Sequence, residues 1–323
     1  MKYFLGIDVG SSKTHALIVE ETGRSVGFGS SGAGNHQGVG YDGLVNILKH
    51  SFEQAREMAG ISARQIAGAG FGVAGYDFPS DREPHLDAIR ALGLSCSVEV
   101  VNDGFNGLLA GATRGIGVNV TSGSGTNCRG RNQQGRIGRI VGNGARFGEF
   151  GGGIEIAYRT LQMVSYAWIR RIPPTRLTAV LLEATGARDE LDLMEGLSND
   201  YYHLSPYIAV DVINAAREGD DAACEVMRWS GEELGWLAVA VARQIEMENE
   251  PVEIVQSGSV FQAGAMLSDP MREVVLRHCP QAIIKRLDGP PVVGSVILGM
   301  EQAQFDGYAI RDIIVRTAKE MVK

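Results

Sequence analysis

The chain has 323 residues, 44% of them hydrophobic, and a formal net charge of −8. This length favours two domains over one, and the composition is typical of a globular protein with sizeable cores. The negative charge argues against general binding to nucleic acid or to an anionic membrane surface.

Targeting segments and cysteine pairs are not evident. We expect no transmembrane helix, because no apolar run is long enough, and the first residues lack the layout of a signal peptide. The four cysteines are scattered without a CxxC pair, which argues against a disulfide framework or a zinc site. The cytoplasm is therefore the expected compartment.

The first expected element is a strand that ends at Asp8 and is followed by a turn of Gly10, Ser11, Ser12 and Lys13. Small residues let backbone N–H groups approach an anion, and the hydroxyls and the lysine add donors and positive charge. A carboxylate at a strand end can hold Mg²⁺, directly or through a water molecule. The stretch fits a polyphosphate site, and it fits an ordinary β-hairpin equally well.

A glycine-rich loop carrying Asn35 and His36 precedes a helix whose apolar residues recur at i, i+3 and i+4. The loop is either a flexible connection or a segment that places these two polar side chains in a binding site.

Asp103 follows a strand predicted over residues 97–101 and precedes a helix of small residues. Ligands of open α/β sheets bind at the carboxyl ends of strands, where a carboxylate can take a proton from a substrate hydroxyl. Asp is also a good helix N-cap, and the local sequence by itself favours that interpretation.

Residues 116–136 repeat the layout of residues 3–30: a strand, a Gly/Ser/Thr turn, a returning strand and a Gly-Arg turn. The second small-residue turn contains Ser124, Gly125, Thr126 and Asn127. Two such hairpins predict a duplicated domain with two phosphate-binding turns that face each other.

Two later segments complete the set of candidate motifs. A third glycine-dense loop over residues 142–153 contains Glu149 and opens a helix of about residues 154–171. A late strand ends in a turn of Gly258 and Ser259, whose amides could contact a nucleotide base or ribose. The last helix, about residues 307–323, is expected to pack on the first domain.

In this order, the motifs resemble those of the BadF/BadG/BcrA/BcrD ATPase family, and within it the N-acetylglucosamine kinase-like sugar kinases. The stretch Thr121–Arg129 is the most specific match, and the resemblance covers nearly the whole chain. It implies an α/β fold of two duplicated ribonuclease H-like (actin-like ATPase) domains around a central nucleotide cleft. The expected domains are 1–113 with a C-terminal helix of about 306–323, and 114–305.

The resemblance also implies roles for residues. By this resemblance, Asp103 is the general base and also contacts the sugar. Asp8 binds Mg²⁺ through a water molecule. The remaining sugar contacts are Asn35, His36, Asn127 and Glu149. The implied contacts of ATP are Gly10, Ser11, Ser12, Lys13, Ser124, Gly125, Thr126, Gly258 and Ser259.

Two positions depart from the family pattern. Glu149 replaces the Asp that contacts the sugar in these kinases, and Asn143 replaces a Trp. These changes alter the pocket and put N-acetylglucosamine in doubt as the substrate more than they put kinase chemistry in doubt.

The expected function is ATP-dependent phosphorylation of a hexose or amino sugar, with ATP, Mg²⁺ and a small sugar as ligands and a homodimer as a family-level expectation. Two alternatives stay open. One is an ATPase that activates a radical dehydratase, although its paired cluster-binding cysteines are not evident here. The other is a non-catalytic nucleotide- or sugar-binding protein.

Overall fold

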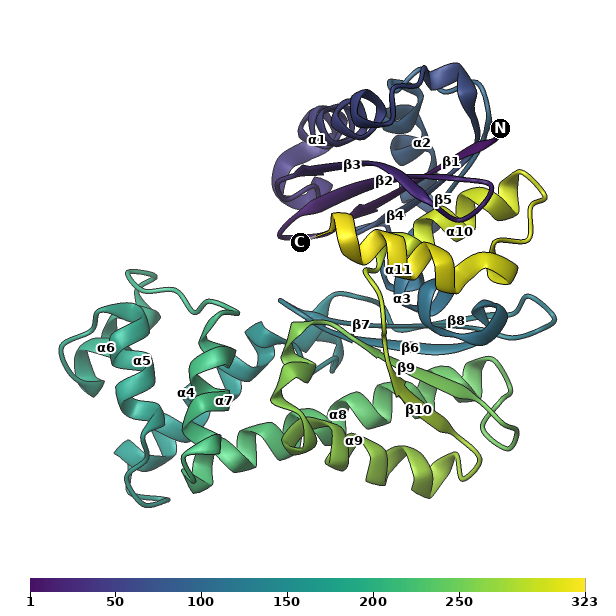
Figure 1. Ribbon diagram of the computed structural model, residues 1–323. Coiled ribbons are helices and arrows are strands. Elements are labelled where there is room, and N and C mark those ends of the chain that lie inside the picture. The colour runs from purple at the N-terminus through teal and green to yellow at the C-terminus, as the bar shows by residue number, and fades with distance from the viewer. Residues whose placement is uncertain (323) are drawn as a thin grey trace.

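The computed structural model describes residues 1–322 and divides them into two α/β domains, one above the other in Figure 1. Each domain is built on a five-stranded sheet within this described part of the chain.

The sheet of the first domain has the order β3-β2-β1-β4-β5. Strands β1, β4 and β5 are parallel, whereas β2 is antiparallel to β1 and β3 is antiparallel to β2. The first hairpin closes where Val9 faces Thr14, so the turn of residues 10–13 lies at the carboxyl end of β1. The strands are β1 (Tyr3–Val9), β2 (Thr14–Glu20), β3 (Ser25–Ser31), β4 (Ile66–Val73) and β5 (Ser97–Asn102).

The sheet of the second domain repeats this arrangement with the order β10-β9-β6-β7-β8. Strands β6, β9 and β10 are parallel, and β7 and β8 continue the sheet as antiparallel strands. Each strand has one counterpart in the first sheet, so the duplication predicted from the two hairpins is confirmed. The strands are β6 (Gly117–Ser122), β7 (Thr126–Arg131), β8 (Ile137–Arg139), β9 (Glu253–Ser257) and β10 (Ile283–Arg286).

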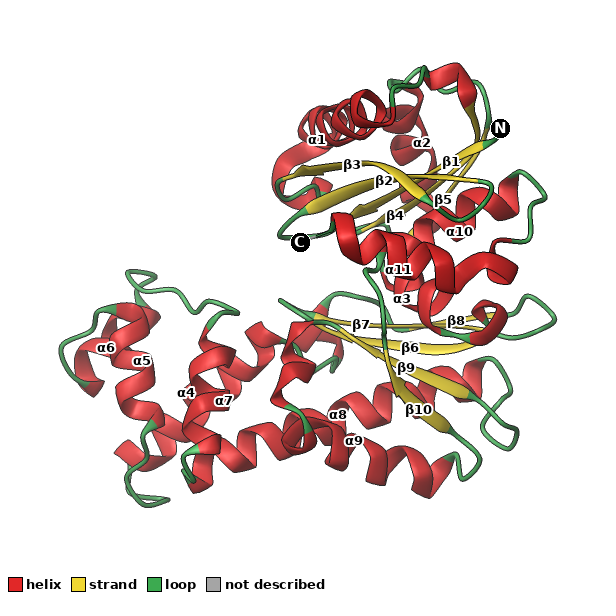
Figure 2. Cartoon of the chain, in the orientation of Figure 1, coloured by secondary structure: helices red, strands yellow, loops and turns green. Residues whose placement is uncertain are grey.

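Helices cover both faces of the first sheet, lie between the domains, and extend the second domain sideways (Figure 2). Helices α1 and α2 cover the outer face of the first sheet, α8 and α9 pack together against the second, and α4–α7 form a helical extension between β8 and β9. The helices are α1 (His36–Ala59), α2 (Arg82–Arg90), α3 (Gly104–Gly111), α4 (Gly153–Trp168), α5 (Leu177–Thr185), α6 (Glu190–Ser198), α7 (Ile208–Arg217), α8 (Asp221–Gln244), α9 (Ala265–His278), α10 (Val292–Gln302) and α11 (Arg311–Met321). No helix within residues 1–322 is long and apolar enough to cross a membrane.

Helices α3 and α10 lie between the two sheets, and α10 packs closely on β1 and β4. Glycines make this approach possible, because a Cβ at Gly6 would lie 2.3 Å from the Val296 nitrogen and one at Gly70 would lie 2.2 Å from the Ser295 carbonyl oxygen. Helix α10 shares an apolar cluster with β1 and β2. Helix α10 thus packs on the first sheet, and the domain boundaries given above stay a prediction.

Candidate active site

The two small-residue turns meet across the space between the domains. A hydrogen bond of 3.2 Å joins the hydroxyls of Ser12 and Ser124. The Gly10 N–H donates to the Lys13 carbonyl in one turn, and the Gly123 N–H donates to the Gly125 carbonyl in the other. Groups 112 residues apart in sequence thus bring the two turns into direct contact.

Beside the second turn lies a cavity of about 150 Å³. Ser124 lines it from the turn between β6 and β7, and Ser259 from the segment after β9. Tyr207, Val210 and Asn214 line it from α7 and the loop before this helix. Gly123 and Ser124 are among its lining residues, so it adjoins the turn that meets Ser12.

Gly258 sets the backbone at the edge of this cavity. Its φ is +97°, and a Cβ there would lie 2.1 Å from the Ser122 carbonyl oxygen. A glycine is therefore required for the second domain to bring the β9 turn against the β6 turn.

Asp8 lies at the end of β1, and its carboxylate accepts from Asn106, which Ser295 in turn orients. Asn106 Nδ2 donates to Asp8 Oδ1 at 2.6 Å, and Ser295 Oγ donates to Asn106 Oδ1 at 2.8 Å. Burial, reinforced by the charge of Asp103, raises the pKa of Asp8 to about 7. A cation bound beside Asp8 would compensate the buried negative charges of Asp8 and Asp103.

The surroundings of Asp8 fit Mg²⁺ bound together with a nucleotide. This ion prefers oxygen ligands and is commonly held by one or two carboxylates plus phosphates and water. Within residues 1–322 no group of three or more His, Cys, Asp or Glu side chains could hold a metal by itself. Asp8 is thus suited to hold the ion jointly with the phosphates of a bound nucleotide.

Asp103 follows β5 at the same end of the sheet as Asp8. Its side chain does not cap α3, because Asn102 Oδ1 instead accepts the Gly104 N–H at 2.9 Å. Asp103 Oδ1 accepts from Asn127 Nδ2 of the second domain at 3.1 Å. Burial raises the pKa of Asp103 to about 6, the positive charge of Arg129 opposes this rise, and the charge of Asp77 adds to it.

Asn127 carries an acceptor that no partner uses within residues 1–322. Its Nδ2 donates to Asn102 and Asp103, while its buried Oδ1 makes no hydrogen bond there. Such an atom is costly to bury unless a ligand or water satisfies it. A hydroxyl beside Asp103 could supply the missing donor.

Asn35 and His36 lie at the start of α1. Asn35 caps this helix, with Oδ1 accepting the Gln37 N–H at 2.9 Å, and its side chain lies against Gly75. The His36 ring stacks on Tyr41 at 4.7 Å, and its buried Nδ1 has no hydrogen-bond partner in the described chain. The loop is therefore ordered by contacts and is not a plain flexible connection.

Glu149 is buried below the third glycine loop, and both of its oxygens accept backbone N–H groups. Oε1 accepts from Val141 at 2.5 Å, and Oε2 accepts from Gly142, Asn143 and Gly144 at 2.9, 2.9 and 3.1 Å. A carboxylate can accept about four hydrogen bonds, and the loop supplies four donors to this side chain.

Sequence reasoning assigned no role to Asn106, Asp77 or Arg129, all of which the structure places against the carboxylates of the site. One feature of the sequence points to Arg129, since a charged residue in the middle of a strand next to Cys128 is unusual in a buried sheet. No feature of the sequence points to Asp77 or Asn106, because their hydrogen-bond partners lie far away in sequence.

Two duplicated sheets, with small-residue turns that meet at the domain interface, define the actin-like ATPase fold. Among solved structures, a protein from Chromobacterium violaceum provisionally named N-acetylglucosamine kinase has a TM-score of 0.69 at 22% identity, covering 92% of this chain and 99% of its own. A ROK family glucokinase from Streptomyces griseus, in complex with glucose and AMPPNP, has a TM-score of 0.59 at 19% identity, covering 98% and 99%.

The chain belongs to the BadF/BadG/BcrA/BcrD ATPase family, whose model matches residues 5–298. It is 26% identical over 304 residues to the N-acetylmuramic acid/N-acetylglucosamine kinase of Clostridium acetobutylicum, covering 94% of this chain and 99% of that protein. It is also 26% identical over 315 residues to the N-acetyl-D-glucosamine kinase of Dictyostelium discoideum, covering 92% and 97%. The family resemblance of the motifs is thereby confirmed.

Proposed function

We propose that this protein is an ATP-dependent sugar kinase that transfers a phosphoryl group to a hydroxyl of an N-acetylated amino sugar. The single observation that carries the proposal is the meeting of the Ser12 and Ser124 turns, the second of which leads into the strand where Asn127 holds the Asp103 carboxylate and keeps an unused acceptor. The curated relatives support the substrate class, because both act on N-acetylated amino sugars by name.

The proposed nucleotide site combines both turns with the cavity beside α7. Gly10, Ser11, Ser12 and Lys13 bind the β- and γ-phosphates from the first domain, and the turn of Ser124, Gly125 and Thr126 binds them from the second. Gly258 and Ser259 border the adenosine. Backbone amides and a lysine aimed at phosphates neutralise charge as it develops.

The proposed reaction needs positioning more than covalent help from the protein. Asp103 accepts the proton of the attacking hydroxyl, and a raised pKa near neutrality suits a general base. When bound at Asp8, Mg²⁺ supplies charge neutralisation on the phosphates. Asn35, His36 and Asn127 hold the sugar, and the chain's two domains exclude water when they close on it.

For Glu149 we propose an indirect role. Direct binding of a sugar hydroxyl stays a prediction, but the four amides that this carboxylate accepts support a role in shaping the loop over the sugar. Asn143, one of those four, then lies where the family's tryptophan shapes the sugar pocket.

An ADP-release screen tests the function. The panel comprises N-acetylglucosamine, N-acetylmuramic acid, N-acetylmannosamine, glucosamine, glucose and mannose, with NMR of the product to identify the phosphorylated hydroxyl. We expect N-acetylglucosamine to be turned over at its 6-hydroxyl. ATP hydrolysis that no sugar accelerates would refute the kinase.

The dehydratase-activator alternative is less well supported. Of the four cysteines, Cys128 and Cys279 are buried, Cys96 is half-buried, and only Cys224 is exposed. A cluster shared between subunits needs paired surface thiolates. We also propose a cytoplasmic homodimer, which light scattering coupled to size exclusion would test.

A further inference from the structure

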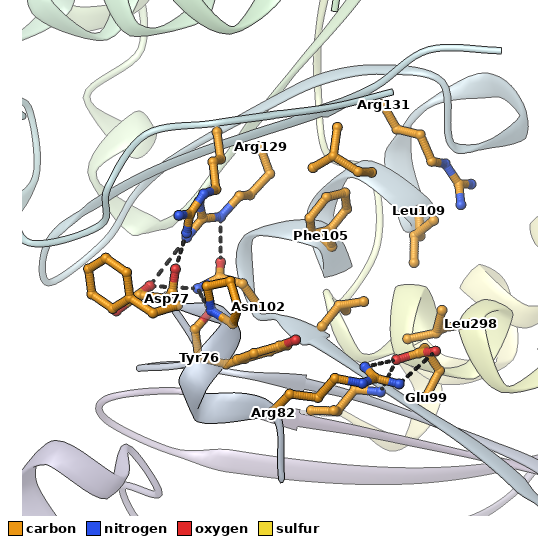
Figure 3. A pocket seen from close by; sticks show the side chains of 16 residues that line it. Tyr76, Asp77, Arg82, Glu99, Asn102, Phe105, Leu109, Arg129, Arg131 and Leu298 are labelled. Carbon is orange, nitrogen blue, oxygen red and sulfur yellow. Dashed lines mark hydrogen bonds and ion pairs between the residues drawn. The ribbon is translucent and has the colours of Figure 1, made fainter. Parts of the chain in front are cut away.

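The wall behind Asp103 is a buried polar network that no part of the proposed mechanism uses. Figure 3 shows it at one end of a cavity of about 460 Å³ between the domains. Arg129 and Asp77 form its centre, with side chains only 1% and 5% exposed and Nη2 and Oδ1 3.2 Å apart.

Each of the three guanidinium nitrogens of Arg129 donates a hydrogen bond. Besides the bond of Nη2 to Asp77, Nε donates to Asn102 Oδ1 at 2.9 Å, and Nη1 donates to the Ile140 carbonyl at 2.7 Å. The three contacts lie in three different directions around the planar guanidinium. The single ammonium group of a lysine could not make all three.

A short relay links Arg129 to the catalytic carboxylate. Asn102 Oδ1 accepts from Arg129 Nε and from Asn127 Nδ2, the latter at 2.8 Å, and the same Asn127 nitrogen donates to Asp103 Oδ1 at 3.1 Å. Asn102 Nδ2 also donates to Asp77 Oδ1 at 3.1 Å, so Arg129, Asp77 and Asn102 form a ring of hydrogen bonds. Moving Arg129 therefore moves the amide that orients Asp103.

The network also crosses the domain interface. Asp77, Asn102 and Asp103 belong to the first domain, whereas Asn127 and Arg129 lie on β7 of the second. The distances between these partners depend on the angle between the domains. A buried ion pair is favourable only with good geometry, so a change of this angle would leave both charges poorly compensated.

We propose that Arg129 is a positioning residue that, through Asp77, Asn102 and Asn127, holds the Asp103 carboxylate in its reactive orientation when the two domains are apposed. This inference rests on the proposed kinase function. Arg129 touches no substrate in this scheme; it acts on turnover through Asn127 and Asp103.

The strand offers a matched control. Arg131 lies two residues further along β7 and also pairs across the domains, with Glu301 of α10 at 3.2 Å. It takes no part in the relay to Asp103. Arg131→Gln thus removes an interdomain ion pair and leaves the base oriented.

The experiment compares wild type, Arg129→Gln, Arg129→Lys and Arg131→Gln in sugar-dependent turnover with saturating Mg²⁺. Because small misplacements of a catalytic group can cost about 10²-fold, we expect Arg129→Gln to lower kcat by about that factor. We expect the KM for ATP to stay within about 3-fold and the fall in kcat to exceed any rise in the KM for the sugar, because Asn127 also contacts the sugar in the proposed mechanism. Arg131→Gln should keep kcat within about 3-fold of wild type.

Arg129→Lys separates positioning from a purely structural ion pair. We expect lysine to restore much of the melting temperature, since it keeps the charge beside Asp77, but to recover less than about a tenth of kcat, because it lacks the planar guanidinium. The double variant Asp77→Asn/Arg129→Gln covers the case in which the single variant does not fold, as it leaves no unpaired buried charge. It too should fold and turn over slowly.

Two failures are distinguishable. Wild-type protein that phosphorylates no sugar refutes the proposed function. An active wild type with an Arg129→Gln variant as fast as Arg131→Gln, or with kcat restored fully by lysine, overturns the positioning role.

Discussion

Replacing Glu149 by Gln tests how the third glycine loop is held. The carboxylate accepts three N–H groups on Oε2 and one on Oε1, from the consecutive residues Val141, Gly142, Asn143 and Gly144. A glutamine can keep its oxygen against the three donors. Its NH₂ then faces the Val141 N–H, donor against donor, and the charge that strengthens all four bonds is gone.

The structure sets the size of the effect. Losing charge assistance and leaving one buried donor unpaired costs about 2–4 kcal/mol, since hydrogen bonds to charged groups contribute more than neutral ones. At about 1.36 kcal/mol per factor of ten, the loop opens about 30- to 1,000-fold more often. The rest of the second domain does not depend on these bonds and should stay folded.

Hydrogen exchange read by mass spectrometry is the direct assay. We expect peptides covering residues 141–144 to exchange faster in Glu149→Gln, and the KM for the sugar to rise with them. Glu183→Gln, at an exposed position on α5, removes a charge elsewhere in the same domain and should change neither. Unchanged exchange together with a large rise in KM would refute the loop role and return Glu149 to direct contact with the sugar.

Other predictions concern the base and the nucleotide. Asp103→Asn should lower kcat by about 10²–10⁴-fold, the range of general-base help, and a variant retaining most of the turnover would remove this assignment. Its stability follows from the raised pKa of about 6. Stability from protonating Asp103 is present below the usual pKa of 3.8 and is lost as pH rises through about 6, so Asp103→Asn should melt no lower than wild type at pH 8. For the same group, kcat/KM should fall as pH drops through about 6, because the base must be ionised; a flat profile between pH 5 and 8 would contradict it. Val210→Trp, on an exposed rim position of the cavity beside α7, should raise the KM for ATP and leave sugar affinity unchanged in calorimetry, and the reverse pattern would move the nucleotide elsewhere.

Much of the fold can be predicted from the sequence, because each copy of the duplication has its own short sequence pattern. Each hairpin has two apolar strands and a Gly/Ser turn, so both copies can be recognised without knowing which other strands they pair with. The packing of α10 on the first sheet is harder to predict from the sequence. Its cause is a set of glycines in β1 and β4 that admit a helix, and nothing in α10 itself reveals which sheet accepts it.

The candidate site was less accessible, because its supporting residues act across the interface. Asp103 was recognisable from its place after a strand, although its local sequence favoured an N-cap; the cap is instead made by its neighbour Asn102. Arg129 and Asp77 are 52 residues apart and meet only when the sheets do. Pairings of this kind follow from the interdomain angle, which no local pattern encodes.

In the proposed mechanism, the duplication lets one cleft serve two ligands. The two turns meet at the Ser12 and Ser124 hydroxyls, but only the first segment carries charged side chains, Asp8 and Lys13; the matching positions of the second are Thr121 and Gly125. In that mechanism, the first domain supplies charge for metal and phosphate, as well as Asp103 for the proton. The second supplies neutral donors, the orienting amide of Asn127 and the cavity proposed for the adenosine. Because neither half then has a complete set, we expect turnover to depend on the angle between the domains, and substitutions that alter this angle to slow catalysis without touching either ligand.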